Sequence, residues 1–281
     1  MARILEGKSV ARDIIESVRD DINQLVTQYG SVPGLTVVKV GDDPGSTAYA
    51  RAIRRSAKNV QIPFTLLELP GDMSAGDCRS TVERLNQDPD VAGVMVLQPL
   101  PRHIPKSLTA EVLDPLKDVD GVTLTSVGRL EAGVACLVPS TPQGGIEILR
   151  YYDIPVAGRH AVVVGRSQVI GKPLATMLLK LDATVTICHS RTPDLGTYTR
   201  QADIVALAAG RASLLTSDMV RSGATILDFG VNVHGAEMVG DADPAVAEVA
   251  EAMTPVPGGT GVVTNAVLMR NTLMAIKNAL A

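Results

Sequence analysis

An apolar run and a glycine-containing turn follow one another in residues 161–174, Ala-Val-Val-Val-Gly165-Arg-Ser-Gln-Val-Ile-Gly171-Lys-Pro-Leu. This order is typical of a buried strand, a tight turn and the start of a helix. Backbone amides at such a helix start favour a phosphate, because they lack intrahelical partners. The glycine spacing differs from the Gly-x-Gly-x-x-Gly fingerprint of dinucleotide-binding proteins. The segment therefore predicts either a phosphate-binding loop around Gly165, Arg166 and Ser167 or a structural β–α turn.

The next apolar run, residues 184–188, ends in a polar and basic cluster made of His189, Ser190, Arg191 and Thr192. Enzymes that use NAD usually place a carboxylate about 20 residues after the glycine turn, where it accepts a hydrogen bond from a ribose hydroxyl. The cluster contains no carboxylate. A cation beside hydroxyl groups suits a 2′-phosphate, and Arg166 and Ser167 add to this arrangement. We therefore expect the cofactor to be NADP rather than NAD.

Other residue types that could do chemistry are scattered. The three cysteines, Cys78, Cys136 and Cys188, lie far apart, and the four histidines show no metal-ligand spacing. We expect no metal site and a reduced, cytoplasmic chain. A formal net charge of −4 and only 2 Phe with no Trp argue against nucleic-acid binding. No apolar run reaches the roughly 18–20 residues that a membrane span requires, so we expect no membrane partner.

Two series of apolar runs alternating with amphipathic segments must position these residues. The first series predicts strands at residues 35–40, 64–69 and 93–97, and helices at residues 11–28, from about 46 and at 81–87. The second series predicts strands at residues 161–164, 184–188, 203–208 and 225–229, and a final helix at 265–280. Strands alternating with helices favour parallel sheets with crossover helices. We predict an α/β fold of two lobes with a ligand-binding cleft between them.

Several further segments match one known family. The matching segments are Val40-Gly-Asp-Asp-Pro-Gly-Ser46 with Tyr49, Pro115-Leu-Lys-Asp-Val-Asp-Gly121, Gly165-Arg-Ser with Gly171-Lys-Pro, Cys188-His-Ser-Arg-Thr192 and Pro255-Val-Pro-Gly-Gly259. On these residues the chain resembles the methylenetetrahydrofolate dehydrogenase/methenyltetrahydrofolate cyclohydrolase family along nearly its whole length. The resemblance implies a homodimer of two-lobed chains. It assigns residues 1–138 and 265–281 to a folate-binding catalytic lobe, and residues 139–264 to a Rossmann-like NADP-binding lobe.

The resemblance also implies a reaction and a set of site residues. Methylenetetrahydrofolate would bind in the cleft and pass hydride to NADP, and the methenyl cation formed would be hydrolysed to 10-formyltetrahydrofolate. Carried over by position, Tyr49 would lie against the folate ring system and Asp120 would hydrogen-bond the pterin. Pro257, Gly258 and Gly259 would border the nicotinamide. The alternatives are ordinary helix packing for Tyr49 and an exposed loop carboxylate for Asp120.

One departure from the family falls on its proton-handling residue. The family's helix reads Tyr-x-x-x-Lys, whereas the fourth residue after Tyr49 is Ile53. At about 100° per residue, Ile53 shares the helix face of Tyr49. The basic residues of the same helix project away from that face; they are Arg51, Arg54, Arg55 and Lys58. We interpret them as a solvated stripe, so the family's lysine has no replacement on this helix.

A second departure lies at the end of the predicted strand 93–97. The family reads Val-Gln-Leu-Pro-Leu-Pro, and this chain reads Val96-Leu-Gln-Pro-Leu-Pro101, so Leu97 stands where the family has its active-site glutamine. A shift of one residue turns a strand side chain to the opposite face. Gln98 is therefore predicted to miss the site unless a bulge restores it. Further substitutions are Val122-Thr-Leu124 for Phe-His-Pro, Ser140 for a cysteine, and Thr260 and Val262 for Val and Pro.

These departures affect the two half-reactions differently. Hydride loss from the methylene carbon is driven by the neighbouring nitrogen lone pair and requires orientation rather than a base. Hydrolysis of the methenyl cation requires a positioned acid or base, which is typically worth 10²–10⁴-fold. We expect an NADP-dependent methylenetetrahydrofolate dehydrogenase whose cyclohydrolase activity is weak or lost. Two other functions stay open: a folate-dependent methylene transferase acting on another small molecule, and a non-catalytic folate- or nucleotide-binding paralogue.

Overall fold

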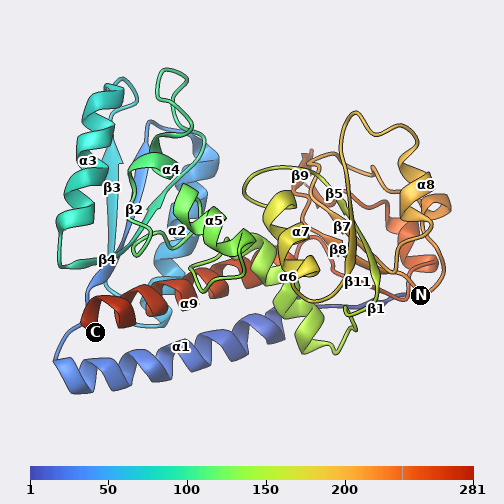
Figure 1. The fold of residues 1–281 in the computed structure, drawn as a ribbon, viewed down its shortest axis with the longest axis horizontal. Coiled ribbons are helices and arrows are strands. Elements are labelled where there is room, and N and C mark those ends of the chain that lie inside the picture. The colour runs from blue at the N-terminus through green and yellow to red at the C-terminus, as the bar shows by residue number, and fades with distance from the viewer. Residues whose placement is uncertain (236) are drawn as a thin grey trace. The chain divides into compact units, whose positions relative to one another are not determined.

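The chain divides into two compact units in the computed structural model, which describes residues 1–235 and 237–281. Unit 1 contains Met1–Arg12 and Thr141–Thr264, and unit 2 contains Asp13–Ser140 and Asn265–Ala281. Both units combine parallel strands with helices, as the sequence predicted (Figure 1). Two long helices, α1 (Gly7–Tyr29) and α9 (Thr260–Leu280), begin in unit 1 and continue in unit 2.

Unit 1 is built on a six-stranded parallel sheet in the order β1-β11-β8-β7-β5-β6. Its strands are β1 (Arg3–Ile4), β5 (His160–Val164), β6 (Thr184–Cys188), β7 (Ile204–Leu207), β8 (Thr225–Asp228) and β11 (Ala252–Met253). The central strands consist almost entirely of buried Val, Ile, Leu and Ala, which is typical of parallel strands covered on both faces. The other elements are α6 (Ser140–Tyr151), α7 (Gly171–Leu179), α8 (Leu195–Thr199), the antiparallel pair β9 (Asn232–His234) and β10 (Glu237–Val239), and two short 3₁₀ helices (Ser217–Met219, Pro244–Glu248).

The start of the chain lies in a different unit from the one predicted. We expected residues 1–138 in one lobe, but Met1–Arg12 belong to unit 1. Backbone pairing is the reason, since Arg3 pairs with Ala252 and Ile4 with Met253. In addition, the Ala2 amide donates to Ala247 O over 2.6 Å. A two-residue strand has no periodicity of its own, so this long-range pairing leaves no local signal in the sequence.

Unit 2 contains a three-stranded parallel sheet in the order β3-β2-β4. Its strands are β2 (Gly34–Val40), β3 (Phe64–Leu69) and β4 (Val91–Val96), and its helices include α2 (Pro44–Asn59), α3 (Ala75–Gln87), α4 (Leu108–Val112) and α5 (Leu124–Glu131). Alternate residues of β2 face two apolar clusters, as a strand's period of two requires. Leu35 and Val37 join residues of α1, α2 and α9, whereas Val38 and Val40 join residues of α3 and α4.

Helix α9 completes the first of these clusters. Leu268, Leu273 and Ile276 are buried with Val18 and Ile22 of α1. An ion pair of 2.7 Å between Lys277 Nζ and Asp21 Oδ2 joins the same two helices. The sequence predicted a helix over 265–280, but α9 begins earlier, at Thr260. Its first turn contains Gly261, which is a poor helix former and weakens the signal for a helix start at Thr260.

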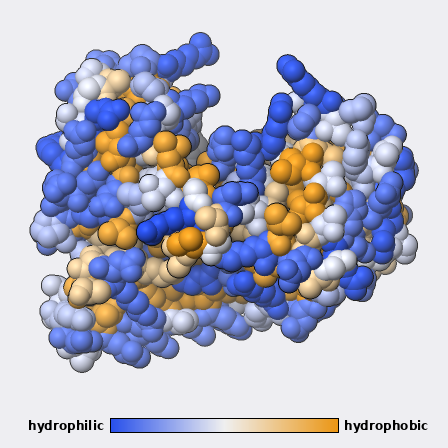
Figure 2. Space-filling model, viewed as in Figure 1, coloured by the Kyte–Doolittle hydropathy of each residue, from blue (hydrophilic) through white to orange (hydrophobic). Residues whose placement is uncertain are grey.

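Hydrophilic residues cover most of the face shown in Figure 2, and apolar side chains gather in smaller areas of each unit. Among the residues that the structure describes, no helix is both long enough and apolar enough to cross a membrane.

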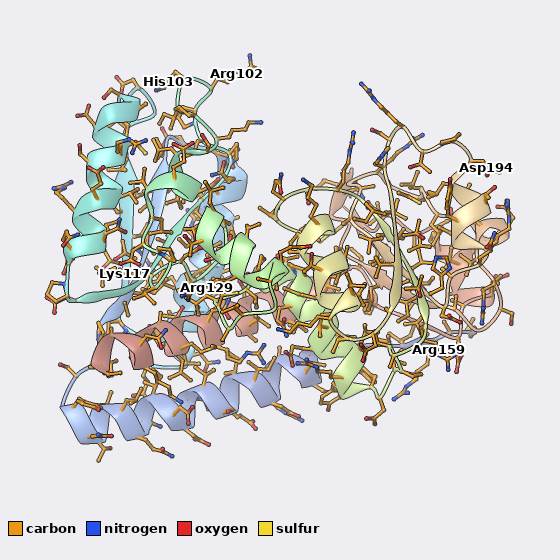
Figure 3. All side chains as sticks on the ribbon, in the orientation of Figure 1. Arg102, His103, Lys117, Arg129, Arg159 and Asp194 are labelled. Carbon is orange, nitrogen blue, oxygen red and sulfur yellow. The ribbon has the colours of Figure 1, made fainter. Side chains whose placement is uncertain are left out.

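Lys117, labelled in Figure 3, belongs to one of the segments that match the family. Its Nζ donates to Leu85 O over 2.9 Å and to Asp88 O over 2.6 Å. Both carbonyl groups lie at the carboxyl end of α3, where helix carbonyls lack intrahelical partners. Lys117 therefore caps a helix, and partial burial lowers the pKa of its ammonium group.

Candidate functional site

The turn between β5 and α7 is held by two backbone contacts that only glycine permits. Gly165 has a φ of +138°, and a Cβ added to it would lie 2.3 Å from Ala208 O. A Cβ on Gly171, the first residue of α7, would lie 2.2 Å from Gly165 O. Because real Cβ atoms do not approach backbone so closely, any other residue would push the loop away from the sheet. The predicted strand, turn and helix start are therefore present.

Ser167 organises this turn internally. Its Oγ accepts hydrogen bonds from Ile170 N over 3.1 Å and from Gly171 N over 3.3 Å. Its carbonyl oxygen accepts from Lys172 N over 3.1 Å. Some of the amides that the sequence offered to a phosphate are thus already bonded within the loop. This arrangement resembles an N-terminal helix cap, in which a serine oxygen satisfies the first amides.

The polar cluster after β6 forms a second tight turn. The His189 amide donates to Thr192 Oγ1 over 2.9 Å, and the Thr192 amide returns a bond of 2.8 Å to His189 O. The Arg191 amide lies 3.2 Å from His189 Nδ1, where it can only donate. Since Nδ1 accepts, the neutral imidazole carries its hydrogen on Nε2. The turn thereby fixes the orientation of the His189 ring.

These two turns and the chain after β7 line one pocket of unit 1, with a volume of about 430 Å³. The predicted cofactor residues that line it are Gly165, Arg166, His189 and Ser190. Ser167 and Arg191 do not belong to the lining. This volume falls within the usual range of small-molecule sites.

Arg211 also lines the pocket, and sequence reasoning missed it. The signal that could have found it is its place just after the carboxyl end of the strand predicted at 203–208, beside the glycine turn. Together with Arg166 and His189 it gives the lining a basic character, and the described lining contains no carboxylate. A basic pocket with closely approaching backbone suits a phosphorylated ligand.

The predicted nicotinamide segment lies outside this pocket lining. The peptide bond before Pro257 is cis, and Gly258 has a φ of +108°. Gly258 O accepts from the Gly7 amide over 2.8 Å, and a Cβ on Gly7 would lie 2.1 Å from Gly259 O. Within unit 1, these glycines therefore let the segment cross the start of α1 at backbone contact distance.

Tyr49 and Asp120 are neighbours in unit 2. Both are partly buried, and burial, together with the carboxylate charge of Asp120, raises the pKa of the Tyr49 phenol. Burial and the nearby Asp118 charge raise the pKa of Asp120 to about 7, against the opposing effect of Ser140. Ser140 Oγ donates to Asp120 Oδ1 over 3.2 Å. The arrangement offers a carboxyl group that changes its charge near neutral pH, next to an aromatic ring.

Asp118 has a separate, structural function. It is fully buried and accepts hydrogen bonds from Val122 N, Thr123 N and Ser126 Oγ over 3.0, 2.8 and 2.7 Å. These bonds join the loop that carries Asp120 to the start of α5. In the described part of the chain, no group of His, Cys, Asp and Glu side chains suited to a metal ion was found.

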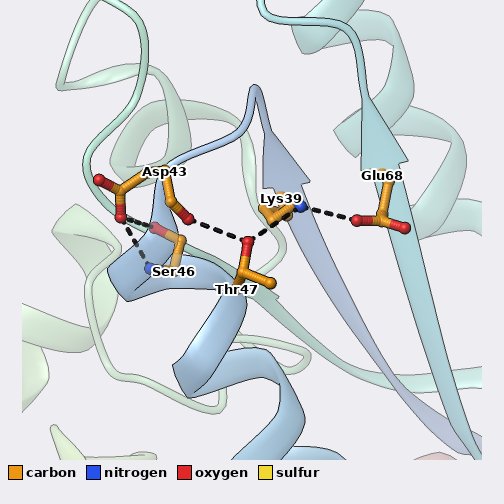
Figure 4. A network of polar contacts seen from close by, with 5 residues as sticks. All are labelled: Lys39, Asp43, Ser46, Thr47 and Glu68. Carbon is orange, nitrogen blue, oxygen red and sulfur yellow. Dashed lines mark hydrogen bonds and ion pairs between the residues drawn. The ribbon is translucent and has the colours of Figure 1, made fainter.

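A polar network fixes the start of the helix that carries Tyr49 (Figure 4). Asp43 Oδ1 accepts from the Ser46 amide over 2.7 Å and caps α2. The nearly buried ammonium of Lys39 donates to Thr47 Oγ1 over 3.2 Å and forms a 2.7 Å ion pair with Glu68 Oε1. Sequence reasoning missed Lys39, because an isolated lysine in an apolar strand carries no motif.

Ile53 and Leu97 are both buried in one apolar cluster of unit 2, with 0% and 3% of their surfaces exposed. Tyr49 packs against the edge of this cluster. Gln98 is exposed instead, and its Oε1 accepts from the Leu100 amide over 3.3 Å. Its backbone oxygen lies 3.0 Å from Ser46 Oγ. The structure therefore brings Tyr49, Asp120 and Ile53 into one region and turns the Gln98 side chain toward its own loop.

Two family models cover most of the sequence. Residues 5–120 match the catalytic domain of tetrahydrofolate dehydrogenase/cyclohydrolase, and residues 139–280 match the NAD(P)-binding domain of the same proteins. The chain belongs to the tetrahydrofolate dehydrogenase/cyclohydrolase family. Its pocket lined by Gly165, Arg166 and Arg211 lies in the NAD(P)-binding domain, and Tyr49 and Asp120 lie in the catalytic domain.

Members of the tetrahydrofolate dehydrogenase/cyclohydrolase family resemble this chain over its full length. The bifunctional protein FolD of Chloroflexus aurantiacus is 47% identical over 281 residues, which cover 99% of each chain. The crystal structure of the bifunctional enzyme FolD from Campylobacter jejuni is 38% identical, with a TM-score of 0.96 and 99% of each chain covered. The Trypanosoma brucei dehydrogenase-cyclohydrolase, solved with NADP and an inhibitor, is 32% identical with a TM-score of 0.94, covering 99% of this chain and 98% of that one.

Position 53 holds Ile where the family resemblance places a lysine, and the basic residues of α2 do not take the place of that lysine. Arg51, Arg54, Arg55 and Lys58 are all exposed. The Arg54 guanidinium lies 5.4 Å from the centre of the Phe64 ring, on the side of α2 that faces β3. The interpretation of these residues as a solvated stripe therefore agrees with their positions.

Proposed function

We propose that this protein oxidises 5,10-methylenetetrahydrofolate to 5,10-methenyltetrahydrofolate with NADP, and that its cyclohydrolase activity is weak or lost. The observation that carries this proposal is the burial of Ile53 and Leu97 in one apolar cluster beside Tyr49 and Asp120. The family resemblance places a lysine and a glutamine at these two positions. Neither aliphatic side chain can donate, accept or transfer a proton.

The basic pocket of unit 1 fits NADP. Arg166, Arg211 and His189 offer positive or hydrogen-bonding groups to its phosphates, and Ser190 offers a hydroxyl. Gly165 lets the loop pack directly against the backbone of Ala208, and both residues line the pocket. When bound, NADP supplies the hydride acceptor. The relative from Trypanosoma brucei, which was solved with NADP, supports the choice of cofactor.

On the folate, the oxidation needs little from the protein beyond orientation. The methylene C–H bond breaks with its electron pair, and a lone pair on the adjacent nitrogen forms the C=N bond of the methenyl cation. No proton moves in this step. We infer that Asp120 hydrogen-bonds the pterin and that Tyr49 lies against the folate rings, so that both residues orient the substrate.

Hydrolysis makes a different demand on the site. A water oxygen bonds to the methenyl carbon and loses a proton, and a ring nitrogen gains a proton as the carbon–nitrogen bond breaks. A positioned acid or base typically contributes 10²–10⁴-fold to such a step. Ile53 and Leu97 supply no such group, and we assign Asp120, the titratable carboxyl group near Tyr49, to hydrogen-bonding the pterin rather than to this proton transfer. We therefore infer that hydrolysis is the half-reaction that is lost.

We also propose that the protein is a homodimer, on the family resemblance alone. Light scattering combined with size-exclusion chromatography tests this. A mass of twice that of the chain is expected, and a single chain mass over the working concentration range would contradict the proposal.

The deciding experiment mixes the purified protein with methylenetetrahydrofolate and NADP, and follows NADPH and the methenyl cation together. Formation of NADPH with accumulation of the methenyl cation is the expected result. NADPH without this accumulation would show that hydrolysis survives. If folate binds but neither product forms, the methylene transferase becomes the better assignment. If no small-molecule acceptor reacts either, a non-catalytic binding protein becomes the better assignment. Omitting NADP is the control for uncatalysed chemistry.

A further inference from the structure

Asp241 is a buried carboxylate of unit 1 that the proposed reaction leaves without a function. It lies after β10, and none of its surface is exposed. Its Oδ2 accepts hydrogen bonds from Ala209 N over 2.7 Å and from Gly210 N over 2.9 Å. Its Oδ1 accepts from Arg211 N over 2.8 Å and from Asn232 Nδ2 over 2.9 Å. Three successive backbone amides therefore converge on this one side chain.

The surrounding chain makes room for this carboxylate and holds it. A Cβ on Gly230 would lie 2.2 Å from Asp241 Oδ1, so a larger residue at position 230 would displace the carboxylate. Asp228 lies behind it, with its Oδ1 accepting from the Asp241 amide over 3.1 Å. Asp228 Oδ2 accepts from the Ala242 amide over 2.8 Å. Asp241 is thus fixed from its backbone as well as from its side chain.

The amides that Asp241 binds belong to a wall of the basic pocket. Ala208, Ala209 and Arg211 line that pocket together with Gly165 and Arg166. Residues 209–211 follow β7 as irregular chain, so no helix or sheet holds their amides. The amide of Ala208 donates to Val164 O, and beyond this point the described contacts of the next three amides are to Asp241. Asp241 therefore determines the path of the chain at Arg211.

Arg211 brings a guanidinium group to the pocket, and the described neighbouring residues do not form an ion pair with it. Among the described residues, the structure shows no ion pair for the guanidinium groups of Arg166 or Arg211. The pocket lining that they share also contains no carboxylate. The negative charge of Asp241 does not neutralise Arg211, because it is directed at backbone amides behind the loop. The Arg211 amide is therefore held by Asp241, and its guanidinium group has no ion-pair partner among the described residues.

We propose that Asp241 is a positioning residue for the cofactor pocket, and that Arg211, whose amide it holds, contacts a phosphate group of the bound cofactor. The inference rests on the proposed use of NADP. A buried amide that loses its acceptor must reach water or another partner, so removal of the carboxylate would let residues 209–211 move. The backbone of Arg211 would then no longer be held in place, and the contact between its guanidinium group and the phosphate would weaken.

Calorimetric binding of NADP and NAD to the full chain tests this, with Asp241→Asn, Arg211→Ala and the double variant. Asp241→Asn keeps the side-chain size but places an NH₂ group where an oxygen accepted. We expect it to raise the Kd for NADP about tenfold or more, which corresponds to about 1.4 kcal/mol. Arg211→Ala should raise the Kd by a similar factor. In the Asp241→Asn background, Arg211→Ala should cost much less than it does alone.

The matched control is Asp243→Asn. Asp243 lies two residues away, accepts from the Ala245 amide over 3.0 Å and caps a 3₁₀ helix. The Asp243→Asn variant should bind NADP with a Kd within about twofold of the wild-type value. Thermal unfolding without ligand, together with folate binding in unit 2, shows whether each variant is folded. If Asp241→Asn does not fold, hydrogen exchange of the wild-type amides 209–211 decides the positioning role. Slow exchange of all three supports it.

Distinct results would overturn each part. An unchanged Kd for Arg211→Ala would overturn the phosphate contact. Strictly multiplicative effects in the double variant, or fast exchange of amides 209–211, would overturn the positioning role. A larger loss for NADP than for NAD assigns Arg211 to the 2′-phosphate, and equal losses assign it to the diphosphate. If the wild-type protein bound neither nucleotide, the proposed function itself would fail, and this inference with it.

Discussion

Ser140 donates its hydroxyl hydrogen to Oδ1 of Asp120 over 3.2 Å. The two residues come from different elements, because Ser140 begins α6 and Asp120 lies in the loop before α5. This bond stabilises the charged carboxylate, whereas burial and the charge of Asp118 destabilise it. The balance leaves the pKa of Asp120 at about 7. The charge on the group that we assign to the pterin therefore changes across the neutral pH range.

Replacing Ser140 by Ala should move this titration upward. The variant loses a hydrogen bond that favours the charged form, so the pKa of Asp120 should rise above its wild-type value. We expect the pH dependence of folate binding to shift to higher pH by a fraction of a unit to about one unit. Folate affinity measured at half-unit pH intervals shows the shift. Ser74→Ala, which removes the cap of α3, is the matched control, and a shift to lower pH in Ser140→Ala would contradict the assignment.

The same carboxyl group should make folding stability depend on pH. Its pKa is about 3.8 in a model peptide and about 7 in the folded protein, so the folded state binds the proton more tightly. The contribution of Asp120 to stability is therefore fully present below pH 4 and is lost as the pH rises through 7. Asp120→Asn should remove this loss. Between pH 5 and pH 8, the urea unfolding free energy should fall more in the wild type than in this variant. Asp42→Asn, at an exposed position, should retain the wild-type fall.

Ile53→Lys alone should not create a fast cyclohydrolase. The new ammonium would enter a fully buried apolar position, and Leu97 in the same cluster would offer it no hydrogen-bonding partner. We expect a loss of about 3–5 kcal/mol in unfolding free energy, as for other unpaired buried charges. Ile53→Met conserves volume and should cost less than about 1.5 kcal/mol. Methenyltetrahydrofolate hydrolysis and urea unfolding measure the two effects, and a large gain in hydrolysis from the single substitution would refute the argument.

Cofactor preference should depend on the arginines near β6 and the glycine turn. Arg191→Ala should weaken NADP binding more than NAD binding if this side chain reaches the 2′-phosphate. The structure adds a stronger expectation for Arg166→Ala, because Arg166 lines the pocket and Arg191 does not. Each change should cost about 1–3 kcal/mol where a charged hydrogen bond is lost. Equal losses of NADP and NAD in both variants would remove the 2′-phosphate assignment.

The ion pair between Lys39 and Glu68 should respond unequally to removal of its partners. Glu68→Gln leaves a nearly buried ammonium without its charged acceptor, whereas Lys39→Met replaces that ammonium with an apolar chain of similar length. Because 61% of the Glu68 side chain is exposed, water compensates part of the loss, and we expect only a small destabilisation from Glu68→Gln. Lys39→Met should cost less. Urea unfolding of both variants gives the order, and the reverse order would contradict this account.

The sequence predicted best the elements whose signal is local. The strand at 64–69 agrees with β3, and the run at 184–188 agrees with β6, because apolar and β-branched residues follow one another there. Helix α3 begins at Ala75, before the predicted residue 81, since its first turn after the Ser74 cap contains no large apolar side chain. Strands β1 and β11 were missed entirely. Each has two residues and forms only by pairing with distant chain.

The candidate site was only partly predictable for the same reason. The glycine turn, His189 and Ser190 carry a recognisable pattern, and the structure places them around one pocket. Arg211 and Asp241 carry no pattern, because their relation depends on hydrogen bonds across thirty residues of chain. The burial of Ile53 was foreseeable from its helix face, but its packing in one cluster with Leu97 requires the positions of α2 and β4 in the folded unit.

The order in which the chain is synthesised differs from the order in which its units can close. Residues 13–140 contain the whole sheet of unit 2, yet the cluster on one face of that sheet includes Leu268, Leu273 and Ile276 of α9. Domains tend to fold as they leave the ribosome, N-terminal parts first. Unit 1 has all its sheet strands once Met253 has emerged. The sheet of unit 2 is made earlier, but α1 and α2 cover that apolar face only in part until α9 is synthesised, and in this interval a chaperone can protect the exposed part.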